Sequence, residues 1–259
     1  MNTTAAHRVL LLPGSVLPAG PAYGPLLEVL RTRSGGAVDA VTKDLEVYAG
    51  PAPSADYSLD TEIAGILREA DAQGWDTFHL LGYSGGGASA LAFAAKHPGR
   101  LESLALLEPA WAGSWGWSPA HRALWEQYRD LDGLGPDEFM AGFVRLGVRP
   151  GVTAGLPVPG GEQPPWMALR PAGIRAFLKT FASYDLDRDA LCRFAKPVYF
   201  ALGGLSNPDD YGEIAERLSG VFPRFRLEVF AGRHHFDPPH RVEPERLADS
   251  LLEHWESAG

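Results

Sequence analysis

One short motif in the chain has the residue types and spacing for nucleophilic catalysis. Gly82-Tyr83-Ser84-Gly85-Gly86 places a serine between two glycines, after an apolar run and before a stretch of small residues. This context predicts a buried strand, a very tight turn and a helix, with the serine hydroxyl exposed at the turn. The backbone N–H of Gly85 could then donate to a developing oxyanion. Ser84 is the predicted nucleophile, and a glycine-rich turn with an incidental serine is the alternative.

A serine hydroxyl needs an adjacent base to react at neutral pH. His234 and His235, near the C-terminal end, are the two candidates. A metal site that also uses Asp237 and His240 is the rival interpretation. It lacks the His-x-His and His-Glu-x-x-His spacings, so we expect no metal and no organic cofactor.

The elements that would position these residues alternate between strand and helix, which indicates a mostly parallel, doubly wound α/β sheet. From residue 112 to residue 189 no clear strand is expected, and helices are predicted at 119–131, 136–146 and 171–184. We interpret 112–189 as an inserted helical cap and 1–111 with 190–259 as the core domain. Strands are predicted at 8–12, 37–44, 77–81, 101–107, 197–202 and 225–230, and helices at 25–31, 59–72, 85–97, 209–219 and 244–255.

In this order of elements and motifs the chain resembles the α/β-hydrolase superfamily over nearly its whole length. The resemblance implies a serine hydrolase whose triad follows the chain order serine, acid, histidine. It favours His235 over His234, because the family's histidine is usually followed by an aromatic residue, here Phe236. The resemblance rests on Asp44-Leu45, the helix at 59–72, Gly82–Gly86 and His235-Phe236.

The acid departs from the usual pattern of the family, which places an aspartate shortly after the strand at 197–202. Residues 203–208 contain no carboxylate. The family's second location, directly after the strand at 101–107, holds Glu108, which we predict to orient the histidine. The alternatives are Asp209, Asp210, or an uncharged partner such as Asn207 or Ser206.

The loop after the first strand should supply the second oxyanion donor as a backbone N–H, with Ser15 as the first candidate and Val16 as the second. The predicted substrate pocket contains Val16, Tyr83, Trp111, Trp115 and Trp166. A group of aromatic residues in and next to the cap either lines this pocket or forms the cap's own core: Trp111, Trp115, Trp117, Trp125, Tyr128, Phe139, Phe143 and Trp166. The Gly/Pro-rich stretch 150–165 is either an entrance flap or a long connection.

Composition limits the partners and the compartment. The formal net charge is −9 and no Lys/Arg patch is visible, which argues against nucleic acid and anionic membranes as partners. The only cysteine, Cys192, cannot form an intramolecular disulfide, and no apolar run is long enough to span a bilayer. We therefore expect a cytoplasmic protein with a small-molecule substrate, and leave a homodimer open.

The predicted function is hydrolysis of a small apolar or aromatic acyl compound, such as an ester, thioester or lactone, through an acyl-enzyme on Ser84. Two alternatives stay open. The same residues could serve C–C bond cleavage, lyase or perhydrolase chemistry, or the chain could be a non-catalytic ligand-binding protein.

Overall fold

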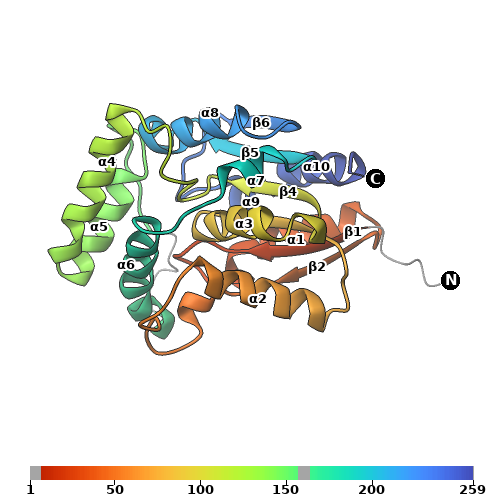
Figure 1. Cartoon of the computed structure of the whole chain (residues 1–259), viewed down its shortest axis with the longest axis horizontal. Coiled ribbons are helices and arrows are strands. Elements are labelled where there is room, and N and C mark those ends of the chain that lie inside the picture. The colour runs from red at the N-terminus through yellow and green to blue at the C-terminus, as the bar shows by residue number, and fades with distance from the viewer. Residues whose placement is uncertain (1–6, 157–163, 259) are drawn as a thin grey trace.

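Six strands form a single sheet in the order β2-β1-β3-β4-β5-β6 (Figure 1). The structure is a computed structural model of the chain and describes residues 7–156 and 164–258. Every pair of neighbouring strands runs parallel, which confirms the α/β architecture predicted from the alternating elements. The strands are β1 (His7–Leu12), β2 (Val38–Thr42), β3 (Phe78–Tyr83), β4 (Leu101–Leu107), β5 (Val198–Gly203) and β6 (Phe225–Phe230).

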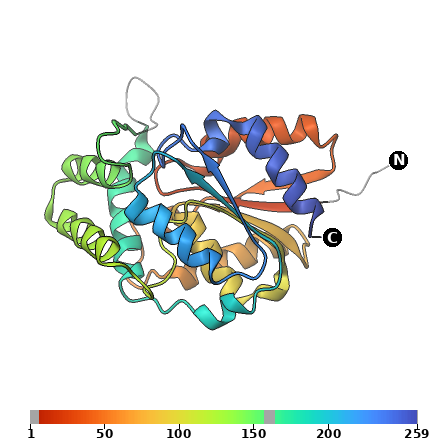
Figure 2. The same cartoon turned by 90° about the horizontal axis from the view of Figure 1, so that it is seen from above.

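Helices cover both faces of this sheet and enclose two separate hydrophobic cores (Figure 2). One core contains Leu26 of α1 and Leu251 of α10, packed on the alternate side chains of the central strands. The other contains Ile66 of α2 and Phe93 of α3. The covering helices are α1 (Ala19–Arg33), α9 (Pro239–Val242) and α10 (Pro244–Glu256) on the first face, and α2 (Leu59–Ala72), α3 (Gly85–Lys96) and α8 (Glu213–Ser219) on the second.

We call residues 112–189, which lie between β4 and β5, the β4–β5 insertion. The regular elements in its described part are all helices. In Figures 1 and 2 its helices α4, α5 and α6 form a layer at one end of the sheet. Trp111, just before the insertion, stacks on Phe181 of α6 with ring centroids 5.3 Å apart. Residues 157–163 of the stretch 150–165 lie outside the described residues. The helices are α4 (Pro119–Asp130), α5 (Pro136–Leu146) and α6 (Arg170–Phe181), with α7 (Arg188–Cys192) leading back to the sheet.

Two helices differ from the sequence prediction. Helix α1 begins at Ala19 and contains Pro25 inside it, because Ala19 and Tyr23 are buried against the sheet and extend the helix backwards. The helix predicted at 209–219 is interrupted: a π-helical turn, η5 (Pro208–Gly212), precedes α8. Among the described residues, no helix is both long and apolar enough to cross a bilayer.

Candidate active site

Ser84 lies at the sharp corner between β3 and α3. Its backbone has φ 52° and ψ −117°, a conformation that costs an L-residue about 1–3 kcal/mol and is held by the surrounding structure. Its N–H donates to the Leu107 carbonyl at 3.1 Å, and its carbonyl accepts from the Ala110 N–H at 2.9 Å. A Cβ on Gly82 would overlap the backbone of Gly86, so the glycines allow strand and helix to approach this closely.

The ring of His235 bridges Ser84 and Glu108. Its Nε2 lies 2.9 Å from Ser84 Oγ, and its Nδ1 lies 3.1 Å from Glu108 Oε2. The Gly203 N–H donates to the other oxygen, Oε1, at 2.7 Å, so both oxygens of the carboxylate act as acceptors. The Nδ1 therefore carries the ring proton, which leaves Nε2 free to accept the proton of the Ser84 hydroxyl. All three side chains are buried.

Two tyrosines fix the orientation of this imidazole. The Tyr211 ring stacks on His235 with a centroid distance of 4.2 Å and an interplanar angle of 10°. Tyr83 packs on His235 at 5.1 Å, and its hydroxyl donates to the His235 carbonyl. Tyr211 comes from the π-helical turn η5, which has no recognisable sequence signal, so sequence reasoning missed it.

The other candidates for base and acid lie elsewhere. His234 accepts the Phe236 N–H at Nδ1, and burial lowers its pKa. Asp209 is exposed, and its N–H donates to the Asn207 side chain, which caps the turn. The Asn207 amide donates to the Leu146 carbonyl, away from His235.

Ser206 is buried, and its hydroxyl has no hydrogen-bond partner in the part of the chain that the structure describes. Asp210 accepts a hydrogen bond from the Tyr128 hydroxyl. The carboxylate that contacts His235 is therefore Glu108. Residues 7–156 and 164–258 contain no group of three or more metal-ligating side chains, which leaves the metal interpretation of the His234 loop without support.

The two predicted oxyanion donors lie beside the serine. The Gly86 N–H is occupied, because it donates to the Pro13 carbonyl at 3.1 Å. Within the described part of the chain, neither the Gly85 N–H nor the Ser15 N–H donates to a protein acceptor. The Ser15 loop is fixed by the Tyr48 hydroxyl, which donates to the Ser15 carbonyl at 2.8 Å. Helix α3 begins at Gly85 and adds its partial positive charge at this point.

A small cavity lies between Ser84 and the β4–β5 insertion. Its volume of about 20 Å³ holds roughly one water molecule. Its walls are mostly aromatic and aliphatic, with a single carboxyl group on Asp210. The lining residues are Ser15, Ser84, Ala110, Trp125, Tyr128, Phe143, Ile174, Phe177, Leu178, Phe181, Asp210 and Tyr211.

The predicted pocket lining is wrong for this cavity, since none of its five residues is part of the wall. Trp111 lies behind the wall, stacked on Phe181. Val16 and Tyr83 line a separate small cavity next to His240.

The other two predicted residues are held by arginines. Trp115 lies beside the Arg217 guanidinium, and Trp166 lies beside that of Arg170. Aromatic content identified the right segment, and Trp125, Tyr128 and Phe143 of the insertion do line the cavity. Which of these aromatic residues line the cavity depends on tertiary packing, which composition does not encode.

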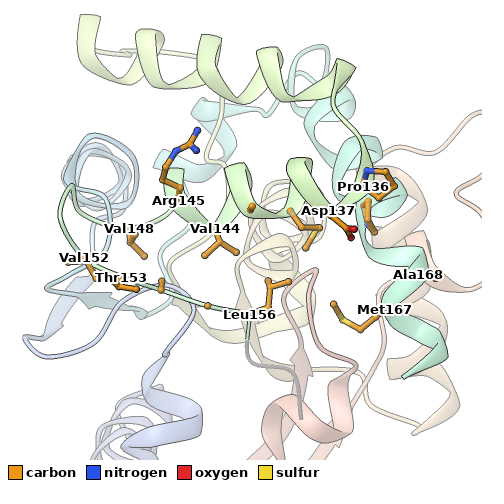
Figure 3. A pocket seen from close by; sticks show the side chains of 15 residues that line it. Pro136, Asp137, Val144, Arg145, Val148, Val152, Thr153, Leu156, Met167 and Ala168 are labelled. Atoms are coloured by element: carbon orange, nitrogen blue, oxygen red, sulfur yellow. The ribbon is translucent and has the colours of Figure 1, made fainter. Parts of the chain in front are cut away.

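A larger pocket of about 720 Å³ lies against another face of α5 (Figure 3). Val144 of α5, Leu156 and Met167 lie around it, and Ser84 is not among its lining residues. Phe143, one position before Val144, points instead toward the cavity at Ser84. The two spaces therefore lie on different faces of this helix.

Comparison with known proteins agrees with the geometry. A model of the alpha/beta hydrolase fold family matches residues 48–154, which include the nucleophile corner and Glu108. The structure of a thermophilic esterase from Thermogutta terrifontis superposes with a TM-score of 0.68 over 99% of this chain and 92% of that chain, at 19% identity. Over residues 48–154 the chain matches the alpha/beta hydrolase fold family, and its fold as a whole is that of the α/β-hydrolases. This confirms the resemblance seen in the sequence.

Two further proteins are similar to this chain. N-formylmaleamate deformylase of Pseudomonas putida is 33% identical over 109 residues, a stretch that spans 41% of this chain and 39% of that protein. The chain thus matches about two fifths of the length of this curated relative. The structure of AqDC, described for recognition and ring-cleavage of the Pseudomonas quinolone signal, superposes with a TM-score of 0.66 at 17% identity over 96% of this chain and 92% of that chain.

Proposed function

We propose that this α/β-hydrolase hydrolyses a small acyl compound through a covalent acyl-enzyme on Ser84. The observation that carries the proposal is the His235 ring, with Ser84 Oγ at 2.9 Å on one side and Glu108 Oε2 at 3.1 Å on the other. Both contacts lie within the range in which a base can take a hydroxyl proton and be held in one tautomer by an acid.

The groups of the site act in sequence during the reaction. His235 Nε2 takes the hydroxyl proton while Ser84 Oγ bonds to the carbonyl carbon of the substrate. The N–H groups of Gly85 and Ser15 donate to the oxyanion. The imidazolium, stabilised by Glu108, then gives its proton to the leaving group. His235 then takes a proton from a water molecule that attacks the acyl carbon, and returns this proton to Ser84 Oγ as the bond to the acyl group breaks.

The cavity walls support a small, largely apolar or aromatic acyl group. Phe177 and Phe181 of α6, with Trp125 and Phe143, exclude water from the space next to the serine. We assign residues 112–189 the role of a cap, because α4, α5 and α6 supply most of these walls. Since the cavity holds only about one water molecule, substrate entry requires these side chains to move apart.

A fluorophosphonate probe with intact-mass detection tests the nucleophile. We expect one adduct on the wild type and none on Ser84→Ala. Ser183→Ala, which removes an exposed serine hydroxyl, should label like the wild type. Folded wild-type protein that forms no adduct at Ser84 would refute the proposal.

A substrate panel then defines the reaction. Aryl esters, thioesters and lactones are compared with β-diketones, cyanohydrins and peracid formation. We expect turnover of the acyl compounds and its loss in Ser84→Ala. Turnover of the diketones or cyanohydrins alone would assign the same residues to C–C bond cleavage or lyase chemistry. Tight ligand binding without turnover, unchanged in Ser84→Ala, would indicate a binding protein.

A further inference from the structure

The cavity at Ser84 contains a carboxyl group that the proposed acyl transfer does not use. Asp210 is 2% exposed and lies in the wall that Ser84 also lines. It is held there by the π-helical turn η5, one residue before Tyr211, whose ring stacks on His235. The rest of the wall is mostly aromatic and aliphatic, so this group is the strongest polar feature in reach of a bound acyl compound.

The hydrogen bonds of Asp210 are incomplete. Its Oδ2 accepts from the Tyr128 hydroxyl at 3.3 Å, while Oδ1 has no partner within residues 7–156 and 164–258. A buried carboxyl oxygen without a donor is costly and uncommon in folded proteins. Asp210 is part of the cavity wall, so a donor group on a molecule in the cavity is placed to pair with this carboxyl group.

The neighbouring charged groups do not fill this role. His121 Nδ1 lies 3.9 Å from Oδ1 but is 2.7 Å from the Asp209 carbonyl, to which it donates. Arg217 donates to the Trp115 carbonyl at 2.8 Å and lies 3.7 Å from Glu213.

Burial raises the pKa of Asp210 to about 7, with Glu108 and Glu213 adding to the rise and Arg217 and the Tyr128 hydrogen bond opposing it. Burial thus disfavours the charged carboxylate at this position. A donor that hydrogen-bonds to the carboxylate favours the ionised form.

We propose that Asp210 accepts a hydrogen bond from an N–H or O–H group on the substrate and thereby selects acyl compounds that carry such a donor. The inference rests on the proposed function, since it takes the cavity at Ser84 to be the acyl site. A hydrocarbon group in the same place leaves Oδ1 unpaired, and sites built around a buried hydrogen bond discriminate strongly against such analogues. The aromatic walls suit either a neutral hydroxyl or an ammonium group.

The test uses 4-nitrophenyl esters of three isosteric acids: butanoic, 3-hydroxypropanoic and 3-aminopropanoic acid. A longer set carries the same change on 4-ethyl-, 4-(hydroxymethyl)- and 4-(aminomethyl)phenylacetic acid. We expect wild-type kcat/KM to favour at least one donor ester over its hydrocarbon isostere by about tenfold or more, in at least one set. The ratio within one preparation does not depend on the fraction of active enzyme.

Substitutions at residue 210 test whether Asp210 causes the preference for donor esters. Asp210→Leu should abolish the preference, so that the ratio of kcat/KM between the donor ester and its hydrocarbon isostere falls to about one. Asp210→Asn keeps an acceptor oxygen without a charge. It should therefore lose a preference for the ammonium ester and keep part of a preference for the hydroxyl ester. Asp209→Asn, on the exposed neighbour, is the matched control and should retain the wild-type ratio.

The outcomes separate this inference from the proposed function. Equal rates on donor and hydrocarbon esters in both sets, with a Ser84 adduct present, would overturn the role of Asp210 and leave the hydrolase intact. A wild-type preference that persists in Asp210→Leu would overturn it as well. If Asp210→Leu does not fold, the ratio in Asp210→Asn decides, and an unchanged ammonium or hydroxyl preference there counts against the inference. No adduct and no turnover of any ester would refute the proposed function itself.

Discussion

Replacing Glu108 by glutamine isolates the contribution of the acid to the proposed mechanism. Glu108 accepts from His235 through Oε2 at 3.1 Å and from the Gly203 N–H through Oε1 at 2.7 Å. Glutamine has the same shape and can keep only one oxygen. If that oxygen stays on Gly203, the amide N–H₂ faces His235 Nδ1 and forces it to become an acceptor. The ring proton then moves to Nε2, which can no longer take the proton of Ser84.

The magnitude follows from the charge and the distance. Unit charges about 4 Å apart interact by about 4 kcal/mol at an effective dielectric constant of about 20. The imidazolium formed during the reaction loses this stabilisation when Glu108 is neutral. Since about 1.4 kcal/mol corresponds to a tenfold change in rate, kcat falls by about 10³-fold from the charge alone. The wrong tautomer adds to this, so we expect a loss of about 10³- to 10⁴-fold.

The assay measures kcat and KM on an ester that the wild type turns over, with active sites counted from the fluorophosphonate adduct. Urea unfolding of Glu108→Gln establishes that the variant is folded. Asp209→Asn, an acid-to-amide change on an exposed residue, should keep wild-type kinetics. A folded Glu108→Gln with kcat within about threefold of wild type would show that this carboxylate does not support His235.

Three further predictions concern the stability of the fold, the orientation of His235 and the pH dependence of stability. Gly82→Ala places a Cβ into the backbone of Gly86, and urea unfolding should show a loss of about 2–4 kcal/mol, whereas an unchanged midpoint would contradict the close approach. Tyr211→Ala removes the ring stacked on His235 and should lower kcat about tenfold, while Tyr211→Phe keeps the stack and the rate in the same ester assay. The pKa of Asp210 rises from 3.8 to about 7 on folding, so the folded state binds more protons between these values and wild-type stability falls as pH rises from about 4 to 7. Asp210→Asn should remove this fall. Its free energy of unfolding, measured by urea titration at a series of pH values, should exceed that of the wild type by an amount that grows to about 4 kcal/mol at pH 7.

Local sequence determined the elements around Ser84 because each depends on short-range chemistry. Ser58 caps α2 together with Thr61, and the helix runs over Leu59–Ala72 as its periodicity predicted. The continuous apolar run at 101–107 forms β4 with the predicted bounds. Strand, glycine-flanked serine and small-residue helix follow one another in the chain, so the corner at residue 84 could be recognised without tertiary information.

The acid and the cavity wall could not be fixed in this way. Glu108, Asp209, Asp210 and Asn207 were all compatible with the sequence, because the choice depends on which side chain reaches one imidazole nitrogen. The aromatic residues of the insertion likewise indicated a cap without indicating its layers. Trp111 was predicted to line the pocket, but it stacks on Phe181 and is not among the residues that line the cavity at Ser84.

The sequence by itself determined the succession of strands and helices along the chain and the sharp corner at Ser84, since these follow from periodicity and from the small size of glycine. Only the tertiary structure decided that His235 meets Ser84 and Glu108 across 151 and 127 residues of chain. It also decided that the π-helical turn at Pro208–Gly212 turns Asp210 into the cavity and Tyr211 onto the imidazole. Such contacts are set by the side-by-side alignment of the carboxyl ends of parallel strands, which brings together residues far apart in sequence.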